Sequence, residues 1–166
     1  SQLRDRDAII SQEGIIFRVY GYSHPLNGYI CDVEYAPSTI YHSQHPKALR
    51  QDKNRIFYKF FEDQGLQFVT QNYPEYQIYY RPLKRQLVGV QVPAISQAKL
   101  PVPALSILYQ QSPTNELLRA LHDILQEITT ISTLKLNDFG IFGSLLHGFY
   151  HPNFSDIDFT IMGKQN

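Results

Sequence analysis

Two stretches decide how this chain folds: Asp138–Gly148 (DFGIFGSLLHG) and Phe154–Ile161 (FSDIDFTI). In the second stretch Asp156 and Asp158 are two positions apart, so a strand over 156–162 would direct both carboxylates to one face. Neighbouring carboxylates repel each other unless they share a cation. Mg²⁺ typically binds one or two carboxylates together with substrate phosphates. The spacing therefore predicts a divalent metal site.

Together the two stretches resemble the signature of the nucleotidyltransferase superfamily related to DNA polymerase β. That signature is an apolar strand, a Gly-Ser turn (here Gly143-Ser144), a short helix with a glycine near its end, and Asp-x-Asp on a strand. The longer sequence over 138–163 and the N-terminal segment over 6–25 resemble a group of archaeal predicted nucleotidyltransferases with an extra N-terminal region. The resemblance implies transfer of a nucleoside monophosphate from a nucleoside triphosphate (NTP) to an acceptor.

The resemblance also implies a role for each matching residue. Asp156 and Asp158 would be the catalytic metal ligands for Mg²⁺ or Mn²⁺, with Asp158 bridging toward the nucleophile. Paired metal ions stabilise both the attacking and the leaving oxygen in such displacements. Gly143 and Ser144 would bind the β- and γ-phosphates through backbone N–H groups, the Ser144 hydroxyl and the N-terminus of the helix that follows. The acceptor stays open: RNA, a protein or a small molecule.

Two departures from the family pattern affect this interpretation. Many relatives carry an arginine just before the helix glycine, where this chain has His147. The family also has a third carboxylate on a later strand, whereas this chain stops at Asn166. We expect that the native protein continues beyond Asn166. The alternatives are a carboxylate from elsewhere in the fold or from a partner chain in a homo-oligomer, or an incomplete site.

The candidate site residues also have less specific interpretations. Asp156 and Asp158 could lie on a solvated strand edge, Ser144 could cap the helix, and His147 and His151 could be ordinary surface histidines. From another functional class, the chain could be a non-catalytic nucleotide- or RNA-binding module that retains the fold.

Composition narrows the class of protein. An apolar fraction of 43% and an aromatic fraction of 13% indicate a folded protein with a core, not a disordered chain. Fifteen basic residues balance fifteen acidic ones, so no global basic field attracts nucleic acid. Cys31 is the single cysteine, which excludes an intramolecular disulfide and a cysteine-based structural metal site; we expect it to be a small buried hydrophobe. With no signal peptide or apolar run of membrane-spanning length, we expect a soluble cytoplasmic protein with no membrane partner.

The predicted architecture is α+β. A β-rich N-terminal module over 1–100, a bent sheet or small barrel, precedes a partial polymerase-β-like α/β core over 101–166. Short β-branched and aromatic runs separated by turns support the module. Strands are predicted over 13–22, 29–35, 54–62, 66–72, 75–80 and 87–92, with a turn at 24–28, an irregular loop over 37–46, and a short helical or connecting piece over 95–99.

The core is predicted to begin with a long amphipathic helix. Ser112 or Thr114 would cap it, Pro113 suits its first turn and Glu116 suits its positive end. A helically spaced stripe of Leu and Ile should face the core: Leu117, Leu118, Leu121, Ile124, Leu125, Ile128 and Ile131. A short strand over 139–142 and a short helix over 145–150 then lead to the carboxylate strand.

Two further features have a functional and a plain interpretation. The basic runs, Lys47 to Arg55 and Arg81 to Arg85, could contact a polynucleotide backbone or simply be solvated. The aromatic residues of the N-terminal module could stack on bases, or could pack the strands as aromatic residues ordinarily do.

Overall fold

The computed structural model describes residues 2–163, which divide into two compact units over 2–98 and 99–163. Ten strands and four α-helices make up the described part of the chain. The predicted α+β class is confirmed. The two units are described here one at a time.

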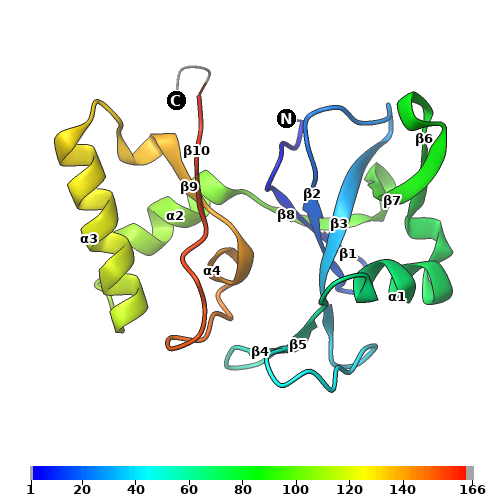
Figure 1. Ribbon diagram of the computed structural model, residues 1–166, viewed down its shortest axis with the longest axis horizontal. Helices are drawn as coiled ribbons and strands as arrows, with labels where there is room; N and C mark the ends of the chain where they lie inside the picture. The colour runs from blue at the N-terminus through cyan, green and yellow to red at the C-terminus, as the bar shows by residue number, and fades with distance from the viewer. Residues whose placement is uncertain (1, 164–166) are drawn as a thin grey trace. The chain divides into compact units, whose positions relative to one another are not determined.

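The first unit is mainly β-structure with one α-helix (Figure 1). Its strands are β1 (Ala8–Ser11), β2 (Ile16–Val19), β3 (Gly28–Pro37), β4 (Leu49–Gln51), β5 (Ile56–Lys59), β6 (Gln77–Tyr80), β7 (Arg85–Gln91) and β8 (Ile95–Lys99). Its helix is α1 (Gln64–Asn72), and short 3₁₀ turns cover Pro74–Tyr76, Arg81–Leu83 and Val92–Ala94.

The long strand β3 organises this sheet. The strands run in the order β4-β5-β3-β2-β1-β8, and β7 joins β3 while pairing with β6 on its other side. β3 pairs with β7 through Gly28–Ile30 and with β5 through Tyr35–Pro37. Among the described strands the sheet forks and does not close. Of the two predicted alternatives, a bent sheet and a small barrel, the barrel is therefore not found.

Alternation along the strands explains the core of the first unit. On β2 and β3, Phe17, Val19, Cys31 and Val33 face the cluster that packs around Val69 and Tyr76, and all of them are buried. Arg18 alternates with Phe17 and Val19 and points to the opposite face. There its guanidinium contacts Asp32 at 3.1 Å and Glu34 at 3.3 Å.

Two sequence predictions in this unit are wrong. The segment 66–72, predicted to be a strand, lies in helix α1, which places Val69 in the core on β3. Packing of this helix overrides the weak helix propensity of Val and Thr within it. The segment 95–99, predicted to be helical or a connection, is strand β8, because it pairs beside β1 at the end of the sheet.

The second unit packs helices against a two-stranded sheet. Its elements are α2 (Pro101–Gln110), α3 (Glu116–Ile131), β9 (Phe139–Ile141), α4 (Gly143–His147) and β10 (Phe159–Ile161), with a 3₁₀ turn at Leu136–Asp138. In Figure 1, α2 lies between α3 and the β9–β10 pair. The hydrophobic core is built from buried residues of α2, α3, β9 and α4: Leu105, Leu118, Leu121, Leu125, Phe139, Ile141 and Leu145. Phe159 of β10 packs against this core.

Helix α3 confirms the predicted amphipathic helix but not its cap. Neither Ser112 nor Thr114 is the capping residue; Asn115 is, and its Oδ1 accepts a hydrogen bond of 3.0 Å from the N–H of Leu118. The predicted apolar stripe is buried at Leu118, Leu121 and Leu125, whereas Ile124 and Ile131 are 37% and 77% exposed and do not face the core as predicted.

Helix α2 is not among the elements predicted from the sequence. Pro101 is the first helical residue and Pro103 lies in the same first turn, where a missing N–H costs no intrahelical hydrogen bond.

Candidate functional site

The turn at Gly143 is the centre of the candidate site. β9 ends at Ile141, and Gly143 then adopts φ +63°, a left-handed conformation that favours glycine. β10 pairs antiparallel with β9, with Phe159 opposite Ile141. The next interstrand hydrogen bond runs from the Phe142 N–H to the Asp158 carbonyl at 3.0 Å. This register places Asp158 beside Gly143.

The approach of these two residues is very close. A Cβ added to Gly143 would lie 2.6 Å from Oδ2 of Asp158. Real Cβ atoms essentially never come so near, so position 143 accepts no side chain while Asp158 keeps this position. The fold thus brings together the Gly-Ser turn and the second carboxylate of the Asp-x-Asp pair.

Ser144 faces the loop that carries the carboxylates. Its hydroxyl donates a hydrogen bond of 3.2 Å to Oγ of Ser155, which also accepts one of 2.7 Å from the His151 N–H. Ser144 is buried, and α4 begins at Gly143 after Phe142, so the alternative of Ser144 as helix cap is wrong. The sequence reasoning did not single out Ser155, although it directly precedes the Asp-x-Asp pair.

The carboxylate strand is shorter than predicted. β10 begins at Phe159, so Asp156 and Asp158 lie in the extended segment that leads into it and not within the strand. Asp156 is exposed and Asp158 is half-buried. The reason is that β9 offers three residues for pairing, and these are used by Phe159–Ile161.

Gly148 is the residue that caps the C-terminal end of helix α4. It adopts φ +76°, and its N–H lies 3.1 Å from the Ser144 carbonyl and 3.3 Å from the Leu145 carbonyl. His147, the last residue of the helix, is buried, and its ring stacks on Phe149 at a centroid distance of 5.2 Å. The prediction of a surface histidine is therefore wrong for His147, while His151 is exposed.

The donor set at this site is made of oxygens. Across residues 2–163 no group of three or more His, Cys, Asp or Glu side chains is arranged to hold a metal ion. Two carboxylates completed by phosphate oxygens are nevertheless an accepted way to bind Mg²⁺ or Mn²⁺. Asp156 and Asp158 fit such an ion only as part of a site that substrate completes.

A second polar feature is the β4–β5 hairpin with the loop before it. The segment 38–61 carries five Lys or Arg residues and one Asp in a chain that is neutral as a whole, so positive charge is concentrated here. The five are Lys47, Arg50, Lys53, Arg55 and Lys59. Arg55 pairs with Asp52, the single acidic residue of the segment.

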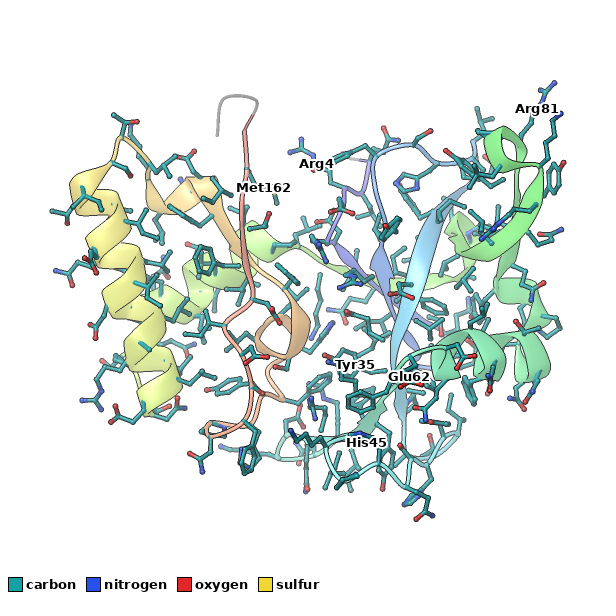
Figure 2. The ribbon with its side chains drawn as sticks, viewed as in Figure 1. Arg4, Tyr35, His45, Glu62, Arg81 and Met162 are labelled. Atoms are coloured by element: carbon teal, nitrogen blue, oxygen red, sulfur yellow. The ribbon has the colours of Figure 1, made fainter. Side chains whose placement is uncertain are left out.

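Aromatic rings accompany these cations. Lys59 Nζ lies 5.5 Å from the centroid of the Phe61 ring. The His45 ring stacks on the same Phe61 ring at a centroid distance of 4.0 Å. Figure 2 shows His45 in the loop beside the hairpin. Cations next to aromatic rings are typical of surfaces that bind single-stranded nucleic acid.

Several titratable groups of the first unit have shifted pKa values. Burial raises the pKa of the Cys31 thiol, which agrees with its expected role as a small buried hydrophobe. Burial and the neighbouring Glu13 carboxylate raise the pKa of Tyr76 to about 12. Burial also pushes the pKa of Glu13 upward, but hydrogen bonds from Tyr76 and Ser11 outweigh it and leave that pKa below its ordinary value.

Comparison with known proteins adds no relative to this description. No protein-family model, no curated protein and no solved structure matches the chain. No helix within residues 2–163 has both the length and the apolar character needed to cross a membrane.

Proposed function

We propose that this chain is a metal-dependent nucleotidyltransferase that moves a nucleoside monophosphate from an NTP to an acceptor. The observation that carries the proposal is the close approach of Gly143 to Asp158, with a Cβ-to-carboxylate distance of 2.6 Å for any side chain added at 143. Two motifs separated in the sequence are thereby joined at one point, next to Ser144 and Ser155. A phosphate-binding turn beside a metal-binding carboxylate is what nucleotidyl transfer requires.

Each residue then has a defined task. The backbone N–H groups at Gly143 and the Ser144 hydroxyl would bind the triphosphate. Asp156 and Asp158 would hold Mg²⁺ or Mn²⁺, and the ion supplies positive charge against the phosphoryl oxygens and the leaving pyrophosphate. Asp158, held by the β9–β10 register, would orient the acceptor hydroxyl, whereas the exposed Asp156 would adapt to the substrate.

The test is turnover with substitutions that preserve shape. Asp156→Asn and Asp158→Asn remove a charge without changing size, and each should abolish the Mg²⁺-dependent release of pyrophosphate from an NTP while the circular dichroism spectrum is unchanged. Asp123→Asn, an exposed acid on α3, is the matched control and should retain wild-type turnover. Wild-type turnover in both site variants would contradict the proposal.

The β4–β5 hairpin favours a second candidate, a non-catalytic RNA-binding module. Its cluster of cations and rings would contact the phosphate backbone and the bases of a single strand. In that case RNA binding persists in EDTA and Asp158→Asn is silent, whereas Lys53→Gln weakens binding and lowers its salt dependence. If the nucleotidyl group is transferred to RNA, RNA is the acceptor; otherwise a protein or small molecule takes that place.

We propose further that a second copy of the chain supplies a third carboxylate to the metal site. Sedimentation over a range of protein concentrations tests this source. A mass that stays monomeric in a sample that turns over NTP excludes the second copy.

A further inference from the structure

The first unit contains a cavity of about 490 Å³ at the fork in its sheet. β3 and β7 pair at Gly28, Tyr29 and Ile30, and the pairing ends at Ile30–Gly89. Beyond that point β7 pairs with β6 alone, through Arg85–Val88. The cavity lies where the two strands separate and is lined by Ile30–Asp32 on one side and Arg85–Val88 on the other. Its size falls within the range typical of small-molecule sites.

The walls of this cavity are mainly apolar, and so is its mouth. Ile30, Leu87 and Val88 contribute aliphatic surface inside. Tyr20, Leu66 and Leu83 also line it, although they come from three separate segments and are 65%, 53% and 58% exposed. Large apolar side chains left in water around one opening typically mark a binding site.

The wall of this cavity carries an excess of positive charge. Arg85 lines the wall, and Lys84 directly precedes it at the end of the turn between β6 and β7. Within the described residues no carboxylate forms an ion pair with either side chain. The one acid that lines the cavity, Asp32, is bound by Arg18 at 3.1 Å. This wall is therefore suited to bind an anion.

We propose that the cavity binds a small organic carboxylate with an aliphatic body. The aliphatic part lies between Ile30, Leu87 and Val88, and the carboxylate contacts the Arg85 guanidinium, which matches carboxylate geometry with two parallel donors. Every residue of the site belongs to the first unit. The proposal is thus independent of nucleotidyl transfer at Gly143 and Asp158.

Calorimetric titration of the full chain with octanoate tests the proposal, with octanamide as the neutral analogue of the same length. Octanoate should bind and octanamide should bind at least tenfold more weakly. Arg85→Gln should weaken octanoate binding about tenfold, as expected for the loss of a charge-assisted hydrogen bond. The matched control is Arg81→Gln, on the same turn but outside the cavity lining, and it should change the affinity less than twofold (Figure 2 shows Arg81 directed away from the β6–β7 hairpin).

A second measurement locates the ligand. In amide NMR spectra, octanoate should shift the resonances of Ile30–Asp32 and Leu87–Val88 while leaving those of α3 in place. Equal affinity for octanoate and octanamide, equal losses in both arginine variants, or shifts confined to residues outside the cavity would each overturn the proposal. Since both arginines are exposed, neither substitution threatens the fold.

Discussion

Replacing Gly143 by alanine tests the geometry of the candidate site most directly. The new Cβ would meet two obstacles: the backbone at φ +63° and the Asp158 carboxylate at 2.6 Å. A left-handed conformation costs a residue with a side chain about 1–2 kcal/mol relative to glycine. To restore an ordinary contact the carboxylate must also move by roughly 1 Å into a less favourable rotamer, which adds about 1 kcal/mol. Gly143→Ala should therefore lower the free energy of unfolding by about 2–3 kcal/mol.

Gly148 offers a matched control at the other end of α4. It has a similar φ of +76°, but a Cβ there would meet no atom within 4 Å. Gly148→Ala should thus cost only the backbone contribution of about 1–2 kcal/mol. The difference between the two variants isolates the contact with Asp158.

The assays are urea denaturation followed by circular dichroism, and NTP turnover of the folded variants. Displacement of a catalytic group by 1 Å lowers turnover about 100-fold, so Gly143→Ala should lose that much and Gly148→Ala little. In a double-mutant cycle, Asp158→Ala should abolish the extra destabilisation of Gly143→Ala. Equal destabilisation by both glycine substitutions, with no coupling to Asp158, would refute the reasoning.

Three further predictions concern stability, each measured as the free energy of unfolding. Tyr76→Phe removes a hydrogen bond to the Glu13 carboxylate and should cost about 1 kcal/mol at pH 7. The folded-state pKa of Glu13 is lowered, so the loss of unfolding free energy in Tyr76→Phe is present above the ordinary pKa of a glutamate and should vanish as the pH falls through the folded-state pKa. A loss that does not change with pH would exclude the ionised pair. Asn115→Ala should cost about 1 kcal/mol through loss of the α3 cap, whereas Asn115→Asp retains the acceptor and should cost less; equal costs would argue against capping. Leu121→Ala, at a fully buried position, should cost about 2–5 kcal/mol, and a loss below 1 kcal/mol would show that the helix is not packed as described.

The elements that the sequence predicts correctly have strong local signals. The stripe of Leu and Ile in α3 repeats with the helical period, and β3 and β7 are rich in β-branched and aromatic residues. Helix α1 lacks such a signal, because its one large buried residue is Val69, and packing on β3 determines its conformation. The sequence does not identify the cap of α3, because Ser112, Thr114 and Asn115 all have side chains that can cap a helix.

In the candidate site, too, the sequence predicts the residues that have a local signal but not the contacts that depend on the tertiary fold. Gly143, Ser144 and Asp158 are recognisable from their spacing, but their proximity depends on the pairing of β9 with β10, which no local pattern specifies. The burial of His147 and the bond between Ser144 and Ser155 likewise depend on the tertiary fold. Long-range contacts of this kind are what a single sequence reveals least.

The fork at β3 has a consequence for the order in which the chain is assembled during synthesis. β3 completes its pairing with β2 as soon as residue 37 has left the ribosome, but its first residue, Gly28, pairs with Gln91. Until β7 emerges, that side of Gly28–Ile30 is an unpaired edge, and such edges promote aggregation. We therefore expect nascent chains that are arrested before residue 85 to depend on chaperones, and chains arrested well beyond residue 91 to be far less dependent.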